Sequence, residues 1–494
     1  MVHNYVPKDI LIAKIIPLVK DPNGDICSAE NYRSISLSSI FLKILDRIMI
    51  LLYGEKLKSD DLQFGFQKWS GTEVCTRTLL ESIDYYLQRG SKAYVVFMDC
   101  SKAFDKVIHS KLFGKIFAAD VHPLYIRMMI FIYRNQSGKV SWDGYESAEF
   151  PIKNGVRQGA VLSPVLFNMY TTELFNILDK LGCGARIRGI FFGLFGYADD
   201  LALMSNTVEG LQKMLDETAE YARAHNINFS TNEIIEKSKT KSMVFGGRKG
   251  NVPEKSMMLN DKPLPWVKRV KYLGTIITND HDKLKEDVGS KRAKFIDNAN
   301  SLLQEFRSAH PCIKSQINMI YNGSVYGGNL YELEGTMCKQ LFNSFNVSIR
   351  TIWELPRQTH RYIVGELAGG HMMSNMISNK INFYRRLESS HKVPVRLLFK
   401  LAARDLRTTT GKSLKLIQNV GIDLGLIGFD SDVLCIDVKR FKSLHRQVSI
   451  PEDEKYRLGV LSDLLGLRTQ FKYFKDDQFV IEDIEDMIED ICVK

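Results

Sequence analysis

Residues 190–204 read Ile-Phe-Phe-Gly-Leu-Phe-Gly-Tyr-Ala-Asp-Asp-Leu-Ala-Leu-Met, and this stretch decides the fold. Two apolar runs, at 190–196 and 201–204, enclose the polar turn Tyr197-Ala-Asp199-Asp200, which predicts a β-hairpin. Upstream, the β-rich run Tyr94-Val-Val-Phe-Met98 predicts a strand that ends at Asp99. Carboxylates are therefore expected at a strand end and at a hairpin turn.

The elements around the hairpin follow the order β-α-β-β-α-β. A helix should begin at Ser163-Pro164, with the serine as its N-cap and the proline in its first turn, and run through residue 178. A second helix is expected at 208–225 and a last strand at 242–246. This order is the ferredoxin-like split βαβ arrangement, an antiparallel sheet with both helices on one face. Its first strand and hairpin are neighbours, so the carboxylates should converge.

Outside this block the sequence pattern is mostly helical. Apolar residues at helical spacing predict amphipathic helices at 35–53 and 72–89. Residues 271–277 predict a further strand, and basic helical patterns continue from 283 to 440. Residues 481–491 predict an acidic amphipathic helix.

The charge distribution indicates a polyanionic partner. The 494 residues carry a net charge of +10, yet residues 476–490 hold eight acids and no base, which leaves an excess of +18 on the remainder. Such an excess favours nucleic acid first and an anionic membrane second.

The eight cysteines show no zinc-ligand spacing. No run approaches the roughly 18–20 uncharged residues of a membrane span, so we expect an intracellular protein that is neither secreted nor associated with a membrane.

Three carboxylates brought together need a compensating cation, because like charges at close range repel. Two Mg²⁺ ions about 3.5–4 Å apart, held by aspartates, form the clamp of nucleotidyl transfer. Asp99 and Asp199 would bridge the metals and Asp200 would complete the site, with Mn²⁺ as an alternative ion. Taken alone, an Asp-Asp pair in a turn is more typical of solvated turn chemistry, so the neighbouring motifs decide.

Those neighbouring motifs resemble, in order and spacing, the reverse transcriptases of non-LTR (LINE-type) retrotransposons over about residues 10–330. Three blocks are highly specific as a set: Phe97-Met-Asp99-Cys-Ser-Lys-Ala-Phe104-Asp105 resembles motif A, Gly155-Val-Arg-Gln158-Gly159 with Ser163-Pro164 resembles motif B, and Tyr197-Ala-Asp199-Asp200 resembles motif C. Further matches are Pro17-Leu-Val-Lys20 with Asn31-Tyr-Arg33, Gln63-Phe-Gly-Phe66, Ser238-Lys239-Thr-Lys241 (motif D), Tyr272-Leu-Gly274 (motif E) and Asn322-Gly-Ser-Val-Tyr326 (thumb).

The resemblance implies roles for residues that bind the nucleotide. Lys20 and Arg33 would hold the incoming triphosphate, although a single exposed cation is more often merely solvated. Gln158 would offer amide hydrogen bonds, and Gly159 would let the backbone approach the nucleotide closely. Phe104 lies where a ribose 2′-hydroxyl would reach, so its ring would reject ribonucleotides, whereas in isolation it would be interpreted as a core aromatic.

Two further roles follow from the same resemblance. Lys239 or Lys241 would protonate the pyrophosphate leaving group as a general acid, and the sequence leaves the choice between them open. Tyr272, Leu273 and Gly274 would form the primer grip.

The resemblance also implies an α+β, right-hand polymerase fold of fingers, ferredoxin-like palm and thumb, with a helical C-terminal region. We expect fingers at 1–93, a palm at 94–278 with inserted finger elements at about 112–155, a helical thumb at 279–380, and a helical C-terminal region with an acidic tail at 381–494. Family members commonly carry an upstream endonuclease, so we expect this chain to be a partial open reading frame without that domain.

The expected function is RNA-directed DNA polymerisation, in which deoxynucleotides are added to a primer 3′-hydroxyl on an RNA template by a two-metal mechanism. The family's mode of insertion implies a nuclear location. Two alternatives stay open: an RNA-dependent RNA polymerase, which Phe104 disfavours, and a catalytically impaired retroelement remnant that only binds nucleic acid. The sequence does not indicate an oligomeric state.

Overall fold

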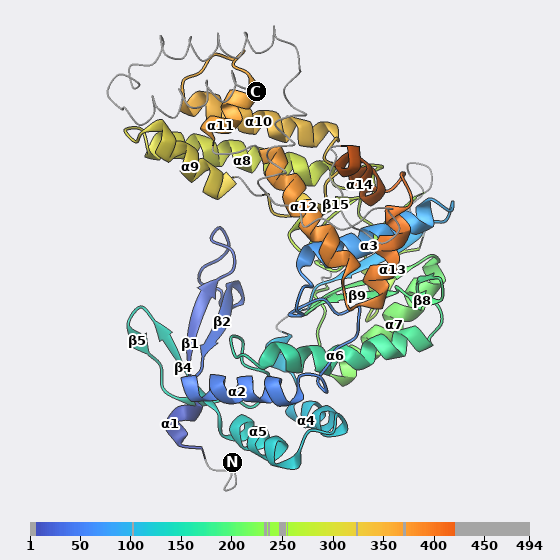
Figure 1. The fold of residues 1–494 in the computed structure, drawn as a ribbon. Helices are drawn as coiled ribbons and strands as arrows, with labels where there is room; N and C mark the ends of the chain where they lie inside the picture. The colour runs from blue at the N-terminus through green and yellow to red at the C-terminus, as the bar shows by residue number, and fades with distance from the viewer. Residues whose placement is uncertain are drawn as a thin grey trace. The chain divides into compact units, whose positions relative to one another are not determined.

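The structure, a computed structural model, describes residues 6–100, 103–231, 235, 238–246, 253, 255–322, 325–368 and 372–419. The chain divides into two compact units, Met1–Leu273 together with His391–Leu398, and Gly274–Ser390 together with Phe399–Lys494 (Figure 1). The expected acidic helix at 481–491 lies outside the described residues, as does the helical pattern beyond 419.

The first unit is built on a four-stranded antiparallel sheet. Its strands are β3 (Ala93–Met98), β9 (Leu194–Tyr197), β10 (Asp200–Ser205) and β11 (Lys241–Phe245). They lie in the order β11-β3-β10-β9, and every neighbouring pair is antiparallel. This is the strand order of a ferredoxin-like sheet, in which the first strand lies beside the central hairpin. The predicted palm topology is confirmed.

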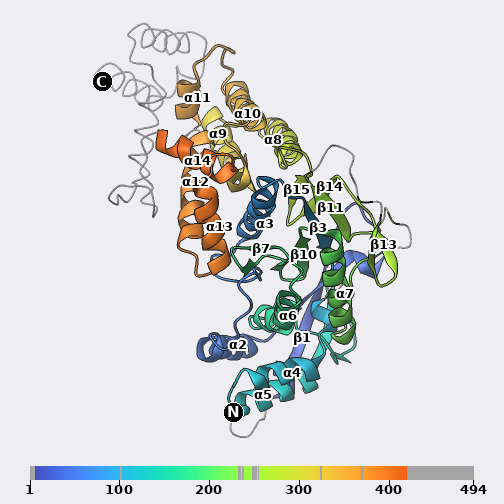
Figure 2. The same ribbon diagram turned by 90° about the vertical axis from the view of Figure 1, so that its right-hand side faces the viewer.

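Three helices pack around this sheet. The connections of the split βαβ arrangement contain α6 (Ser163–Lys180) and α7 (Val208–Ala224), which lie side by side in Figure 2 and contact each other. Helix α7 packs on β3 and β10, and α3 (Thr72–Leu87) packs on β3 and β9. Ten consecutive residues of α3, from Val74 to Ile83, are buried. The carboxylates at the sheet's end therefore rest on a well-packed core.

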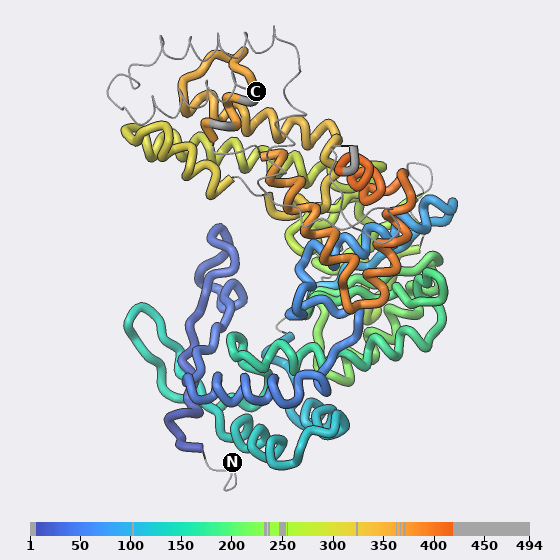
Figure 3. Tube along the Cα trace, in the orientation of Figure 1, coloured from blue at the N-terminus to red at the C-terminus, as the bar shows by residue number. Residues whose placement is uncertain are grey.

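The second sheet of this unit joins distant parts of the sequence. It contains β1 (Ile12–Val19), β2 (Tyr32–Leu37), β4 (Ser137–Trp142), β5 (Tyr145–Glu146) and β6 (Phe150–Pro151). Strand β1 pairs antiparallel with β2 and parallel with β4, so the blue and teal segments of Figure 3 meet across more than a hundred residues of sequence. We call β1, β2 and the loop between them the finger ribbon.

Smaller elements complete this unit. They are α1 (Lys8–Leu11), α2 (Ile40–Tyr53), α4 (His109–Ala118), α5 (Pro123–Asn135), the hairpin of β7 (Arg186–Ile187) and β8 (Ile190–Phe191), the hairpin of β12 (Met257–Leu259) and β13 (Lys262–Leu264), and β14 (Arg269–Tyr272).

Three local predictions were wrong, each for a physical reason. The helix expected at 35–53 begins only at Ile40, because Ser39 caps it and residues 35–37 pair as part of β2. Ser163 is not an N-cap but the first residue of α6, with Leu162 before it. The strand expected at 271–277 is broken by a turn at Leu273 and Gly274, whose φ angles are +46° and +75°.

The second unit is mostly helical after the short strand β15 (Thr275–Thr278). Its helices are α8 (Lys285–Glu305), α9 (Pro311–Asn322), α10 (Thr336–Ile352), α11 (Arg361–Leu367), α12 (Met372–Glu388) and α14 (Thr409–Asn419), and α13 (Val393–Ala403) crosses the boundary between the units. In the part of the chain that the structure describes, no helix is long and apolar enough to cross a membrane.

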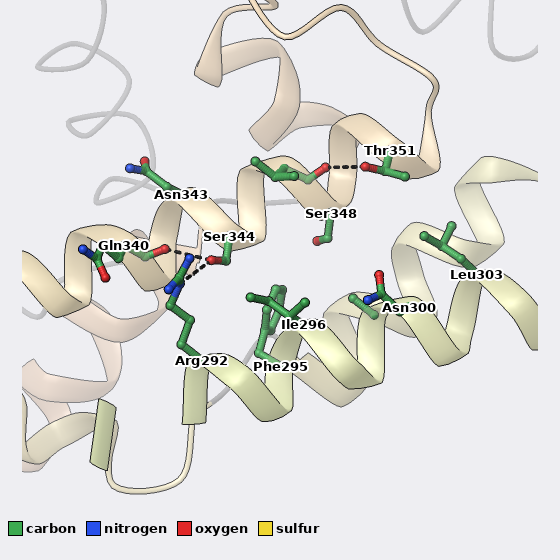
Figure 4. A pocket seen from close by; sticks show the side chains of 12 residues that line it. Arg292, Phe295, Ile296, Asn300, Leu303, Gln340, Asn343, Ser344, Ser348 and Thr351 are labelled. Atoms are coloured by element: carbon green, nitrogen blue, oxygen red, sulfur yellow. Dashed lines mark hydrogen bonds between the residues drawn. The ribbon is translucent and has the colours of Figure 1, made fainter. Parts of the chain in front are cut away.

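A cavity of about 450 Å³ lies between α8 and α10 (Figure 4). Arg292 Nε donates a hydrogen bond to Ser344 Oγ across it, over 2.8 Å. Apolar, amide and hydroxyl side chains make up the rest of the lining, and none of the lining residues is acidic. The cavity therefore offers hydrogen-bond donors without a negative charge.

Candidate active site

Strand register brings the three predicted carboxylates to one end of the palm sheet. The last pair between β10 and β3 is Leu201 with Met98, so Asp200 and Asp99 occupy the next position on the two strands. Asp200 in turn pairs with Tyr197 of β9, which leaves Ala198 and Asp199 as a two-residue turn. The convergence that the sequence predicted is thus produced by antiparallel pairing.

The three carboxylates repel one another in a partly desolvated setting. Burial, followed by the charges of Asp199 and Asp99, raises the pKa of Asp200 to about 7. Burial also raises the pKa of Asp199, and the nearby charge of Asp99 acts in the same direction. A cation at this position would relieve the repulsion and hold both groups ionised.

The donor set suits a hard divalent cation such as Mg²⁺, which prefers carboxylate oxygens. Within the described residues, however, no three His, Cys, Asp or Glu side chains are gathered around one point as a ready-made metal cage. Mg²⁺ normally takes one or two carboxylates and completes its octahedron with water and substrate phosphates. Aspartates at a strand end fit that open type of site, in which Asp99 and Asp199 would be the principal ligands.

A side chain to which the sequence analysis gave no role holds the turn in place. Gln63 is fully buried, and its Oε1 accepts a hydrogen bond from Ala198 N at 2.9 Å while its Nε2 donates to Ala198 O at 3.3 Å. Ala198 has a φ of +58°, a left-handed conformation that is unfavourable for a residue with a side chain. The paired hydrogen bonds of Gln63 therefore fix the strained residue that precedes Asp199.

The loop around Gln63 is itself anchored to the palm. Phe64 N donates to Gly196 O at 2.7 Å, and Asn168 of α6 donates from Nδ2 to Gly65 O at 2.7 Å. A Cβ on Gly65 would lie 2.2 Å from Ala198 N, so only glycine fits there. The Gln63-Phe-Gly-Phe66 block thus acts as a clamp on the carboxylate turn.

The two predicted triphosphate cations lie on the finger ribbon. Arg33 is exposed on β2, and its charge lowers the pKa of Asp199, opposing the effect of burial. Lys20 follows the end of β1, and its Nζ donates to the carbonyl of Glu30 at 2.7 Å. Arg33 thus interacts electrostatically with the carboxylate turn. Lys20 is exposed at the start of the loop that joins β1 to β2.

The predicted nucleotide loop at 155–159 lies between the ribbon and the palm. Gly155 has a φ of +85°, and a Cβ there would lie 2.7 Å from the carbonyl oxygen of Asp105. Gly159 has a φ of +112°, and a Cβ there would lie 2.9 Å from Ser36 O. The carbonyl of Gln158 accepts a hydrogen bond from Ser36 N at 2.7 Å. Both glycines are therefore required by close backbone contacts within the protein, and Gly159 is also exposed.

Phe104, the predicted ribose gate, is held between aromatic rings. Its ring stacks on Phe167 of α6 at a centroid distance of 4.5 Å and meets Phe66 edge to face at 6.1 Å. Phe104 is half-buried, and its carbonyl accepts a hydrogen bond from Val156 N at 2.8 Å. The ring is thus fixed in orientation by α6 and by the Gln63-Phe-Gly-Phe66 block.

The remaining predicted site residues are the two candidate general acids, Lys239 and Lys241, and the primer grip at 272–274. Lys239 Nζ lies 4.0 Å from Asp99 Oδ2 and is largely exposed, whereas Lys241 is on β11 opposite Phe97. Tyr272 is buried, with its ring 5.1 Å from that of Phe97, so its side chain is not available to a primer. The half-buried Leu273 and the exposed Gly274 form the turn that follows.

Comparison with known proteins agrees with this geometry. Residues 19–277, just over half of the chain, match the family described as reverse transcriptase (RNA-dependent DNA polymerase). A stretch of 220 residues is 27% identical to the Pol polyprotein of the type-2 retrotransposable element R2DM of Drosophila melanogaster, which is 44% of this chain and 20% of that protein. A stretch of 285 residues is 26% identical to the RNA-directed DNA polymerase from the mobile element jockey of Drosophila funebris, covering 55% and 29% of the two chains.

Among solved structures, apo telomerase from Candida tropicalis aligns with 83% of this chain and 67% of its own at 13% identity and a TM-score of 0.42. That similarity is too low to support an argument.

A ferredoxin-like sheet that carries three aspartates at one end is the palm of a right-hand polymerase. The family match is specific for one branch of that class, and the chain belongs to the reverse transcriptase (RNA-dependent DNA polymerase) family. It spans less than a third of the length of the two retrotransposon proteins described above.

Proposed function

We propose that this chain is the RNA-directed DNA polymerase of a non-LTR retrotransposon, which adds deoxynucleotides to a primer 3′-hydroxyl on an RNA template. The observation that carries the proposal is the register of the palm, which brings Asp99, Asp199 and Asp200 to one sheet end. The raised pKa of Asp200, about 7, supports it, because the cluster is electrostatically unbalanced without a cation.

Two Mg²⁺ ions bound here would activate the attacking hydroxyl and stabilise the leaving phosphate. Asp99 and Asp199 would hold these ions at the end of the sheet, and Asp200 would add a third carboxylate. Lys239, 4.0 Å from Asp99, is the group placed to supply a proton to the leaving pyrophosphate. Arg33 offers a fork of donors that suits the oxygens of a triphosphate.

Selection of deoxyribose is assigned to Phe104. Its ring is fixed between Phe66 and Phe167, so it cannot swing aside to admit a 2′-hydroxyl. An apolar ring also offers no hydrogen bond to that hydroxyl, which leaves the hydroxyl desolvated and unpaired. We therefore assign the chain to DNA rather than RNA synthesis.

Template and primer binding is assigned in part to the helical second unit. The cavity between α8 and α10 offers Arg292 together with amide and hydroxyl groups, and no carboxylate lines it. Such a lining suits a sugar-phosphate backbone, to which most protein hydrogen bonds in nucleic-acid complexes are made. The net charge of +10 supports the same assignment. The family resemblance supports a nuclear location.

Primer extension on oligo(dT)-primed poly(rA) with Mg²⁺ tests the proposal. We expect extension with dTTP and not with UTP, and we expect Asp199→Asn to abolish it. Asp143→Asn is the matched control, because Asp143 also lies in a hairpin turn, that between β4 and β5, but is exposed and belongs to the second sheet of the first unit rather than to the palm sheet. Salt-sensitive binding of the hybrid without any incorporation would instead establish the remnant that only binds nucleic acid.

A further inference from the structure

A lysine that lies in the sequence between the two parts of the helical second unit is buried in the first unit. The segment His391–Leu398 belongs to the compact unit that contains the palm, although more than a hundred residues separate it from Leu273. Within it, Lys392 has only 2% of its surface exposed. A lysine is almost never buried to that extent unless its ammonium group has partners, because the charge is costly to desolvate.

Lys392 is attached to the loop that clamps the carboxylate turn. Its Nζ donates a hydrogen bond to the carbonyl of Gln63 at 3.1 Å and lies 5.4 Å from the centre of the Phe64 ring. Asp60 and Asp61 attract its charge, and Asp61 Oδ2 also accepts a hydrogen bond from the neighbouring Val393 N at 3.1 Å. The segment is therefore attached to the loop by its side chain and by its backbone.

The same loop transmits this attachment to the catalytic carboxylates. Lys392 donates a hydrogen bond to the backbone of Gln63, and the Gln63 side chain makes two hydrogen bonds to Ala198, the residue before Asp199, while its Oε1 also accepts one from Gly65 N at 3.0 Å. Ala198 has an unfavourable φ of +58°, so its conformation depends on such support. The buried Gln63 thus connects the segment His391–Leu398 with the turn that would bind the metal.

We propose that Lys392 is a positioning residue of the polymerase: by holding Gln63, it keeps Ala198 and hence Asp199 in the geometry that binds the catalytic metal. The inference deepens the proposed function and rests on it for its kinetic consequences. It also assigns a role to a segment in which the sequence shows no motif. The segment His391–Leu398 must therefore be folded in place before the turn at Ala198 and Asp199 is ordered.

Single-nucleotide extension by Lys392→Met in the full chain tests the kinetic consequence. Methionine keeps most of the aliphatic stem but removes the ammonium group. We expect kcat to fall about tenfold, since small displacements of reacting groups cost one to two orders of magnitude, while KM for dTTP and the affinity for primer-template stay unchanged. Lys400→Met is the control, because Lys400 is exposed on α13, the helix that begins directly after Lys392.

A double-mutant cycle then asks whether Lys392 acts through Gln63. Gln63→Ala removes both hydrogen bonds to Ala198, so adding Lys392→Met should lower kcat no further. Losses that multiply in the double variant would overturn the proposal, as would an unchanged kcat in folded Lys392→Met.

Hydrogen exchange provides a readout that does not need polymerase activity. The Ala198 amide donates to Gln63 Oε1, so the peptide that contains it should exchange faster in Lys392→Met than in Lys400→Met. Asp61→Asn, which weakens the same attachment from a more exposed position, should give a smaller increase and serves if Lys392→Met does not fold. Faster exchange in a chain without polymerase activity would support the attachment and reject the proposed function. Unchanged exchange in both variants would contradict the attachment itself.

Discussion

The carboxylates of the palm turn and two cations of the finger ribbon, Arg33 and Lys20, carry charges of opposite sign and are supported in opposite ways. Ala198 and Asp199 form a two-residue turn whose backbone is clamped by the buried Gln63. Arg33 and Lys20 are exposed, and Lys20 donates only to a carbonyl of its own ribbon. The negative charges are thus fixed by packing, whereas the positive charges keep rotamer freedom.

This difference matches what each group has to do. A metal ion with octahedral preference demands carboxylates at fixed positions, so a rigid turn is required. Neutralising a triphosphate needs charge within a few ångströms, which a long side chain can supply from several rotamers. Substitutions in the turn and its clamp should therefore reduce the catalytic rate, and substitutions in the ribbon should weaken nucleotide binding.

The largest effect is expected at Asp99. Asp99→Asn removes a metal ligand, and metal stabilisation of the transition state is worth several kcal/mol, so the extension rate should fall by about 10³-fold or more. Rapid-quench extension at saturating dTTP measures this. A fall of less than tenfold would mean that the metal binds elsewhere and that the rigid carboxylate turn is not the metal site.

The clamp should give the next largest effect. Gln63→Ala leaves the ligands in place but frees the backbone of Ala198, so kcat should fall about 10²-fold with little change in KM. Gln67→Ala is the matched control, because Gln67 lies in the same loop but donates its hydrogen bond to Ser59. Equal losses in the two variants would mean that the loop matters only for folding.

The finger ribbon should show the reverse pattern. Arg33→Ala removes a charge-assisted contact worth about 1.5–3 kcal/mol, so KM for dTTP should rise about tenfold, since Arg33 is exposed, while kcat stays nearly constant. Lys14→Ala on the same ribbon, whose lysine pairs with Glu146 at 3.3 Å, should leave KM unchanged. Steady-state extension over a range of dTTP concentrations measures both. A fall in kcat without a change in KM for Arg33→Ala would contradict the assignment of nucleotide binding to the finger ribbon and of the catalytic rate to the carboxylate turn.

The last prediction is a pH dependence of metal activation. The pKa of Asp200 is raised to about 7, so below that pH the carboxyl is protonated and the metal must displace a proton. The Mg²⁺ concentration for half-maximal rate should therefore rise up to about tenfold per pH unit below 7. Because the native pKa is the raised one, the metal-free protein should also lose thermal stability as the pH rises towards 7. A half-maximal concentration that is constant from pH 6 to pH 8 would contradict this assignment.

The sequence predicted the parts of this site that depend on local pattern. Continuous apolar runs on either side of Tyr197–Asp200 and ahead of Asp99 were sufficient to predict the palm's strands, and their order predicted the neighbours in the sheet. The register that aligns Asp99 with Asp200 then followed from antiparallel pairing.

The support of the site could not be predicted in the same way. Gln63 and Ala198 are 135 residues apart, and Lys392 is 329 residues from Gln63. Hydrogen bonds at such separations leave no periodic signal in the sequence. Ser163 shows the opposite failure: a serine before a proline has the composition of a cap, but the backbone had already entered the helix at that residue. Composition near a helix start does not fix the starting residue.

Cleavage by bound Fe²⁺ tests the central claim most directly, namely that the turn and the end of β3 hold the catalytic metal. Fe²⁺ replaces Mg²⁺ in the chain bound to primer-template, and hydroxyl radicals generated there cut the nearest backbone. We predict two cuts, one near Asp99 and one near Asp199, both lost in Asp199→Asn and retained in Asp143→Asn. Cuts at other positions, or cuts that persist in Asp199→Asn, would contradict the account.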